Sequence, residues 1–382
     1  MDTTWLWLSD PDMSEIEASA VREVLVSPRM SAGPVVEEFE KAFAAYLGRK
    51  HAIAVSSGTI GLLLTLQSYG LKPGDEVIAP SHSFRETGHA IALCGARPVF
   101  ADVDYWTGAL APDKAAACLT ERTRMIVAGN PAGHPAPWAP LRELADGAGV
   151  PLIEDSTEAI GSVYKGARVG SFGDCSVFDF SQPGVIICGE GGMVVTDDED
   201  RAHAIRRLRS RRLEERASVV ISAYPPLQSQ MSDVQAALGL AQLGRLDVLL
   251  ERRKTVEAYY ADYMRSFEGI KDPYIAPDVD EVHWFLYVVH LGTRFSRSSR
   301  DSIVDDLKNE MIEAAAYSHP LHLQRRYFDM GYRRGDFFVT EKVADRAVAL
   351  PFHAHLTEEH VAFIVGTMKD ASINVGAGAA IY

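Results

Sequence analysis

The feature that most constrains the fold of this 382-residue chain is a regular alternation of short apolar runs and helical patterns. It begins near residue 50, and turn-forming residues at 72–75 and 166–170 separate some of its elements. The predicted strands are 51–55, 76–80, 97–101, 124–128, 151–155 and 192–196, and a helix is predicted over 59–69. This alternation predicts an α/β fold, with a mostly parallel sheet that has helices on both faces.

The pattern changes after residue 240. A long charged helical stretch over 242–264 leads into a region with fewer and more polar strands, one of them over 284–290. We therefore predict a large α/β domain with an N-terminal arm over residues 1–245, and a smaller α+β domain over residues 246–382. The Gly- and Ala-rich tail over 371–382 is predicted to be a frayed end.

Composition argues against several classes of function. The formal net charge of −14 would repel nucleic acids and anionic membranes, whereas a hydrophobic content of 47% supports a sizeable core. There is no apolar run long enough to span a membrane and no basic signal region. The four cysteines form no C-x-x-C pair, so neither disulfides nor a metal site are predicted. We expect a cytoplasmic protein that binds a small-molecule substrate.

Several motifs spread along the chain together resemble one enzyme family. They are a Ser-Ser-Gly-Thr turn at 56–59, a Pro-Ser-His-Ser-Phe segment at 80–84 and a Phe-x-Phe to Gly-Glu-Gly-Gly segment at 178–192. With them the chain is similar to the DegT/DnrJ/StrS family of pyridoxal-phosphate-dependent sugar aminotransferases. This resemblance implies a seven-stranded, aspartate-aminotransferase-like large domain. It also implies a homodimer, because the helix predicted over 231–243 resembles the interface helix of the family.

The resemblance implies a cofactor pocket built from five residues. Ser57, Gly58 and Thr59 would present backbone N–H groups to the cofactor phosphate, as helix N-termini do for anions. Phe84 would stack on the pyridine ring, and Asp155 would pair with its nitrogen. Helix capping alone also explains the Ser-Gly-Thr turn. For Asp155 we favour a functional role, since open α/β sheets bind ligands at the carboxyl ends of their strands.

The lysine that normally anchors the cofactor is missing. In the aligned segment its position falls on Gly184, and no lysine occurs between Lys165 and Lys254 to replace it. This lysine would form the Schiff base and carry protons between substrate and cofactor, so its loss removes both the anchor and the base. We therefore expect no covalently bound cofactor. Pyridoxal phosphate or pyridoxamine phosphate would bind non-covalently, if either binds.

Other departures from the family pattern fall in the same pocket. Asp179 replaces a serine that donates to the phosphate, and two unit charges ~4 Å apart interact by about 4 kcal/mol at an effective dielectric constant of ~20. Glu158 replaces a glutamine. The segment that reaches the partner's site begins here at Gln228 and has lost its arginine, so Gln228 marks a vestigial pocket. Arg85 and Glu86 stand where small or apolar residues are usual.

The altered pocket retains groups suited to acid–base chemistry. Asp155, Glu158 and Asp179 should lie within reach of one another, with Arg85 and Glu86 across the cleft. Closely spaced carboxylates raise one another's proton affinity, so one can act as an acid and another as a base. An arginine–carboxylate network that only fills the vacated space explains the pattern equally well. Candidates of lower rank are His319, His322 and His134.

Three hypotheses follow. The first is a repurposed enzyme of secondary-metabolite biosynthesis, of the antibiotic or deoxysugar type, which carries out cyclisation, isomerisation or dehydration without covalent cofactor. The second is a sugar aminotransferase or dehydratase-like enzyme with a non-covalent cofactor. The third is a silent subunit that completes the site of an active paralogue.

Overall fold

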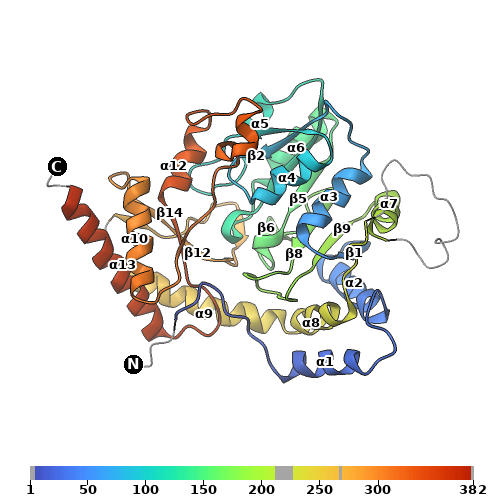
Figure 1. The fold of residues 1–382 in the computed structure, drawn as a ribbon, viewed down its shortest axis with the longest axis horizontal. Coiled ribbons are helices and arrows are strands. Elements are labelled where there is room, and N and C mark those ends of the chain that lie inside the picture. The colour runs from blue at the N-terminus through green and yellow to red at the C-terminus, as the bar shows by residue number, and fades with distance from the viewer. Residues whose placement is uncertain (1–4, 211–226, 266–268, 380–382) are drawn as a thin grey trace.

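The computed structural model describes residues 5–210, 227–265 and 269–379. A larger part built around a long sheet lies beside a smaller part that holds the C-terminus (Figure 1). The helices α8 (Asp233–Gly244) and α9 (Leu246–Met264) follow one another along one side of the molecule and connect the two parts (Figure 1). The boundary predicted at residue 245 falls between these two helices, and the domain division itself stays a prediction.

The larger part contains a seven-stranded sheet in the order β1-β9-β8-β5-β4-β2-β3. The strands from β3 to β8 are parallel, whereas β9 is antiparallel to both of its neighbours. This confirms the predicted α/β class and the mostly parallel sheet. The strands are β1 (His51–Val55), β2 (Glu76–Pro80), β3 (Arg97–Ala101), β4 (Thr123–Gly129), β5 (Leu152–Asp155), β8 (Cys175–Asp179) and β9 (Gly192–Thr196).

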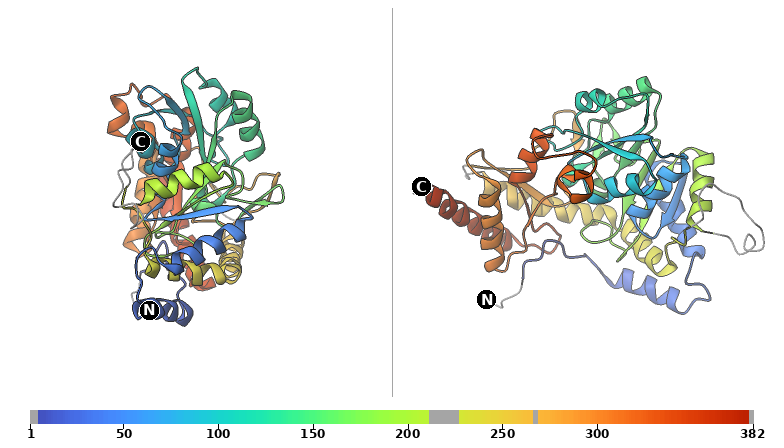
Figure 2. Two further views of the ribbon diagram at one scale, coloured as in Figure 1. Left: turned by 90° about the vertical axis from the view of Figure 1, so that its right-hand side faces the viewer. Right: turned by 45° about the horizontal axis from the view of Figure 1, so that its top comes forward.

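Helices cover both faces of this sheet (Figure 2). Alternate side chains of each strand pack against opposite layers, which explains why the strands are apolar almost throughout. One face packs against α3 (Gly58–Ser68), α4 (Arg85–Leu93) and α7 (Glu199–Arg209). The other face packs against α2 (Pro34–Leu47), α5 (Pro112–Ala117), α6 (Trp138–Ala148) and α8.

The smaller part is built on an antiparallel sheet in the order β10-β12-β14-β13. Its strands are β10 (Ile270–Lys271), β12 (Tyr287–Leu291), β13 (Ala315–Ala316) and β14 (Ala347–Leu350). Its helices are α10 (Arg297–Asn309), α11 (Arg325–Phe328), α12 (Phe338–Arg346) and α13 (Glu358–Ala379). A third, short sheet links the parts, because β11 (Val279–Glu281) pairs with β6 (Val163–Tyr164), which also pairs with β7 (Ala167–Arg168).

The prediction of a frayed end over residues 371–382 is wrong for 371–379, and residues 380–382 lie outside the described part of the structure. Helix α13 continues through this region to Ala379. Ala371 is only 3% exposed and belongs to the same apolar core as Met264 of α9 and Ile303 of α10. Tertiary packing around Ala371 therefore outweighs the low helix propensity of the glycines that follow it in α13.

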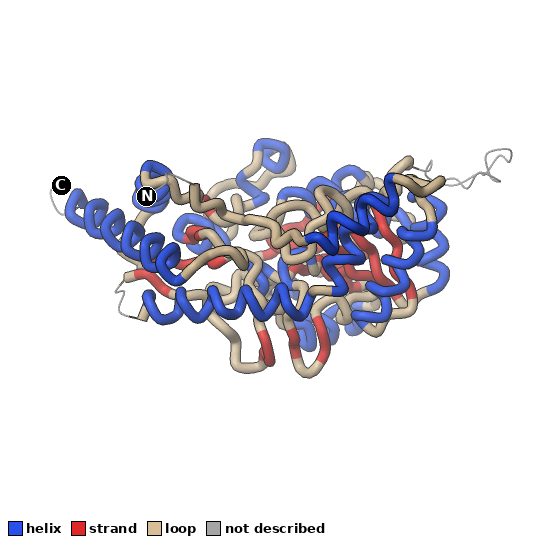
Figure 3. The backbone as a smooth tube through the Cα atoms, turned by 90° about the horizontal axis from the view of Figure 1, so that it is seen from below, coloured by secondary structure: helices blue, strands red, loops and turns tan. Residues whose placement is uncertain are grey.

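The N-terminal segment joins the two parts of the molecule. It starts beside the smaller part and runs along the molecule to α1 (Glu15–Leu25), which packs on α8 (Figure 3). Leu6 forms a β-bridge with Ile312, and the Asp12 carboxylate pairs with Arg245 at 2.8 Å. These contacts fix the arm against the smaller part, through Ile312, and against the junction of α8 and α9, through Arg245.

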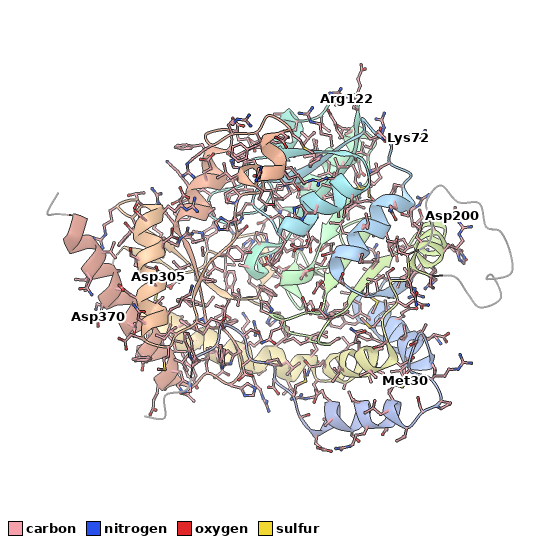
Figure 4. All side chains as sticks on the ribbon, viewed as in Figure 1. Met30, Lys72, Arg122, Asp200, Asp305 and Asp370 are labelled. Carbon is pink, nitrogen blue, oxygen red and sulfur yellow. The ribbon has the colours of Figure 1, made fainter. Side chains whose placement is uncertain are left out.

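Several charged side chains lie at the periphery. Lys72, Arg122 and Asp200 lie at the rim of the larger part, and Asp305 and Asp370 lie on α10 and α13 of the smaller part (Figure 4). In the described ranges, no helix is both long and apolar enough to cross a membrane. The same residues contain no cluster of His, Cys, Asp or Glu suited to hold a metal ion.

Candidate active site

A large cavity lies where the carboxyl ends of three parallel strands meet the smaller part. It has a volume of about 920 Å³. Pro80, Gly129 and Asp155, which end β2, β4 and β5, line one side of it. Tyr317 and Phe285 line it from the smaller part. This is the edge at which open α/β sheets bind ligands, because strand ends and loops converge there.

Asp155 lies at the end of β5 and faces this cavity. Its Oδ1 accepts a weak hydrogen bond of 3.3 Å from the backbone N–H of Thr157. Burial is the largest cause and raises the pKa of Asp155 to about 6, although hydrogen bonds from Thr157 lower it; the charges of Asp179 and Glu86 raise it by smaller amounts. At neutral pH this carboxylate is largely ionised and basic enough to accept a proton.

Glu158 lies in the same loop, in the 3-10 helix η2 (Thr157–Ala159). Its Oε2 accepts hydrogen bonds from the Tyr317 hydroxyl at 2.6 Å and from the Ala132 backbone N–H at 2.7 Å. Burial raises the pKa of Glu158 to about 8 despite these bonds. The Oε1 atom is buried and has no hydrogen-bond partner among the described residues. Glu158 is therefore a protonated acid at neutral pH with one oxygen available to a ligand.

Asp179 ends β8 beside the N-terminus of α3. Its Oδ2 accepts a hydrogen bond of 2.6 Å from the backbone N–H of Gly58. Its Oδ1 accepts from the Ser181 backbone N–H at 2.8 Å and from the Ser181 hydroxyl. A side chain at Gly58 would collide with this carboxylate, since its Cβ would lie 2.6 Å from the Asp179 Cβ. The chain's own carboxylate thus takes the position in which a helix N-terminus binds an anion.

The rest of the turn acts as an ordinary helix cap. Ser57 is the N-cap of α3, and its Oγ accepts a hydrogen bond of 3.3 Å from the backbone N–H of Ile60. Thr59 follows in the first turn of the helix. Asp179 occupies the N–H of Gly58, so a cofactor phosphate at this turn would lose that donor and would lie close to a carboxylate.

Gly184 lies in the loop between β8 and β9, next to Pro183, which lines the cavity. A side chain there would be tight, because its Cβ would lie 3.1 Å from the Ser181 carbonyl oxygen. None of the described residues that line the cavity is a lysine. The described cavity lining thus offers no lysine amine for a Schiff base, and the N–H of Gly58 is already bonded to Asp179.

The other predicted site residues are placed as follows. Phe84, Glu86 and His319 line the cavity, and the Phe84 ring, 43% exposed, meets Phe285 edge to face at 6.5 Å. Arg85 begins α4, but its side chain lies outside the described part of the structure.

Three further candidates lie away from this cavity. Gln228 is exposed and does not line the cavity of its own chain. His322 is buried between Ser81 and Glu341, which it contacts at 2.6 and 3.1 Å. His134 accepts a hydrogen bond of 3.0 Å from the Ala276 backbone N–H. The partners of both histidines give them structural roles.

Two cavity residues were not singled out by sequence analysis. Tyr317 donates to Glu158, and His82 packs edge to face on the Tyr317 ring at 5.6 Å between centroids. His82 is buried, and this burial lowers its pKa to about 4, so the imidazole is neutral. Tyr317 lies two positions before the predicted residue His319, and His82 lies two positions before the predicted residue Phe84. This closeness in sequence was the signal that could have identified them.

Residues 11–369 match the sequence profile of the DegT/DnrJ/EryC1/StrS aminotransferase family. The chain belongs to this family. It is 36% identical over 344 residues to the GDP-perosamine synthase of Caulobacter vibrioides, which covers 90% of this chain and 91% of that protein. It is 34% identical over 371 residues to the spore coat polysaccharide biosynthesis protein SpsC of Bacillus subtilis, with coverage of 94% and 95%.

Solved structures of family members have the same fold. The putative sugar aminotransferase Spr1654 of Streptococcus pneumoniae, in its PMP form, superposes with a TM-score of 0.92 at 26% identity. That match covers 98% of this chain and 99% of the other chain. The same protein has also been solved in a PLP form, so members of the family bind both forms of the cofactor. The family and fold implied by the sequence motifs are thereby confirmed.

Proposed function

We propose that this chain is an enzyme that converts a sugar-derived small molecule by acid–base chemistry and holds no pyridoxal phosphate covalently. One observation carries the proposal: the Asp179 carboxylate accepts the Gly58 N–H at 2.6 Å, at the helix N-terminus where a cofactor phosphate would bind. A phosphate dianion there would meet this carboxylate at close range. Gly184, in place of the lysine, supports the same conclusion.

The two carboxyl groups of the cavity would divide the chemistry. Asp155, with its pKa raised to about 6, is the base that takes a proton from the substrate. Glu158, with its pKa raised to about 8, is the acid that gives a proton to a substrate oxygen. One proton leaves the substrate and one arrives, so an isomerisation or cyclisation balances without a further reactant. If the protonated oxygen is a hydroxyl, it leaves as water, and the reaction is a dehydration.

The substrate class follows from the relatives and the cavity. GDP-perosamine synthase and the spore coat protein SpsC, by their names, act in the biosynthesis of sugars and polysaccharides. The cavity of about 920 Å³ has room for a substituted sugar, and its lining includes both apolar and hydrogen-bonding side chains. We place the enzyme in secondary-metabolite biosynthesis, and we propose that it works as a homodimer.

A second candidate function retains the cofactor as a non-covalent guest. Phe84 and Asp155, which would contact the pyridine ring, both line the cavity. The pneumococcal relative has been solved in both a PMP form and a PLP form, so both are candidates for that guest. Such an enzyme would transfer an amino group or remove water.

A titration separates these functions. The purified protein is titrated with pyridoxal phosphate and with pyridoxamine phosphate, and binding is followed by calorimetry and absorbance. Absence of binding at millimolar ligand supports the cofactor-free enzyme. Tight binding without an aldimine absorbance supports the second candidate. An aldimine absorbance would overturn both. If no ligand binds and sugar substrates show no turnover alone but show it after addition of an active paralogue, the chain is a silent subunit.

A further inference from the structure

A second hollow of about 650 Å³ lies at the end of β12, where His290 and Leu291 line it. Its walls come from the loop after β3, the loop after β10 and helix α12. It shares no lining residue with the 920 Å³ cavity. A void of about 30 Å³, bounded by His82, Tyr317, Trp106 and His290, lies between the two. The two cavities are therefore neighbours but separate.

Exposed aromatic side chains form much of the wall. Trp106, Tyr274 and Phe338 are 47%, 40% and 62% exposed, although side chains of this size are usually buried. The Trp106 and Tyr274 rings lie 5.7 Å apart between centroids at an interplanar angle of 43°. Three aromatic rings left open to solvent around one hollow mark a binding surface rather than a core.

Three cations lie at the same hollow. The Lys271 ammonium sits 4.6 Å from the centre of the Trp106 ring, and the Lys342 ammonium sits 3.8 Å from the centre of the Phe338 ring. The Arg346 guanidinium donates to two backbone carbonyls. Within the described ranges, none of the three has a carboxylate within ion-pair distance. The lining carboxylate, Asp272, accepts a hydrogen bond from Tyr287 instead.

This local positive charge contrasts with a chain whose net charge is −14. Cation–π pairs alone explain why each lysine lies on a ring, and each such pair at an exposed site stabilises by roughly 0.5–1 kcal/mol. They do not explain why three cations share one hollow with a single lining carboxylate, Asp272, since like charges repel. An anion among them would remove this repulsion.

The inner wall of the hollow adds a hydrogen-bonding group without a partner. His290 lines the hollow, and its Nε2 atom is buried and has no hydrogen-bond partner among the described residues. Burial lowers the pKa of His290 to about 4, so the ring is neutral and offers one donor or one acceptor. A buried polar atom without a partner is costly unless a ligand or water satisfies it.

We propose that this hollow is a second binding site that takes an aromatic anion. A planar ring packs against Trp106 and Tyr274, and a phosphate or carboxylate on that ring faces Lys271 and Lys342. The site is independent of the reaction proposed for the larger cavity. The same cationic side chains can bind a phosphate or a carboxylate, and the probes in the following test distinguish these two groups.

The test is calorimetric titration of the full chain with 1-naphthyl phosphate, 1-naphthoate and neutral 1-naphthol. Quenching of tryptophan fluorescence gives a second readout, and Trp106→Phe should abolish most of that quenching. We expect at least one anion to bind with one site per chain, and the anion that binds more tightly identifies the group. The double variant Lys271→Met/Lys342→Met should weaken this binding at least about ten-fold, because it removes both charges.

The matched control is Lys308→Met/Lys369→Met, which removes two exposed lysines on α10 and α13. It should leave the dissociation constant unchanged, and raising the salt concentration should weaken binding to the wild type. Three results would each overturn the proposal: equal affinity for 1-naphthol and the anions, unchanged affinity in the double variant, or no binding of any probe at about 10 mM.

Discussion

The Asp179 carboxylate and the backbone N–H of Gly58 are joined by a hydrogen bond of 2.6 Å at the N-terminus of α3. A helix N-terminus carries about half a positive charge, which a carboxylate neutralises as well as a phosphate group does. Here the carboxylate belongs to the chain itself and comes from the end of β8. At this helix N-terminus the chain's own carboxylate takes the place of an external anion. The first two predictions depend on this contact.

Restoring the lysine alone should not restore an aldimine. Gly184→Lys supplies the amine, but Asp179 still occupies the phosphate position, so pyridoxal phosphate should leave the visible absorbance unchanged. The double variant Gly184→Lys/Asp179→Ser should produce an aldimine band. Full recovery by Gly184→Lys alone would show that Asp179 does not exclude phosphate.

Asp179→Ser alone should lower stability and create an anion site. Loss of the carboxylate cap should reduce the free energy of unfolding by about 1 kcal/mol, measured by urea denaturation. Added inorganic phosphate should then stabilise the variant more than the wild type. The control is Asp198→Ser, since Asp198 caps α7 in the same way away from the cavity. An equal phosphate effect in both variants would contradict the assignment.

Amide variants should separate chemistry from packing at the candidate acid and base. Asp155→Asn and Glu158→Gln should keep the wild-type circular dichroism spectrum but lose at least about 100-fold in kcat, a typical effect of losing a general acid or base. The wild-type rate should follow a bell-shaped pH profile with limbs near 6 and 8, where the two groups titrate. Unchanged activity in both variants would leave these residues only a packing role.

Stability should fall as pH rises through the range in which Glu158 titrates. Its pKa in the folded state is raised to about 8 from the ordinary glutamate value of 4.5, so the folded state holds a proton that the unfolded state has lost. This contribution is fully present below about pH 4.5 and is lost as pH approaches 8. The free energy of unfolding of the wild type should therefore fall between pH 5 and 9, relative to that of the Glu158→Gln variant. Parallel curves for the two proteins would show that the carboxyl group is not perturbed.

Tyr317→Phe should shift the alkaline limb of the rate profile upward. The Tyr317 hydroxyl donates to Glu158 at 2.6 Å and stabilises its ionised form, so its removal should raise the pKa of Glu158 further. Tyr317 is a positioning residue in this scheme. A uniform loss of rate with no shift of the limb would indicate that the hydroxyl only holds the loop in place.

Much of the fold was predictable because it depends on local patterns. Six predicted strands match β1, β2, β3, β4, β5 and β9 to within one residue at each end. Strand β8 was not singled out, since its short run Cys175–Asp179 follows a stretch rich in turn residues and carries no pattern of its own. The tail over residues 371–379 was wrongly predicted because its helix depends on packing against α9 and α10.

The sequence by itself determined the family, the sheet and the absence of a lysine at position 184, because motifs, periodicity and residue identity are properties of neighbouring positions. Only the tertiary structure decided which groups meet. Asp179 reaches Gly58 across 121 residues, and Tyr317 reaches Glu158 across 159 residues. The raised pKa values of Asp155 and Glu158 likewise come from burial in the folded molecule. Desolvation and hydrogen bonding act through space, so the order of residues along the chain does not specify them until the chain has folded.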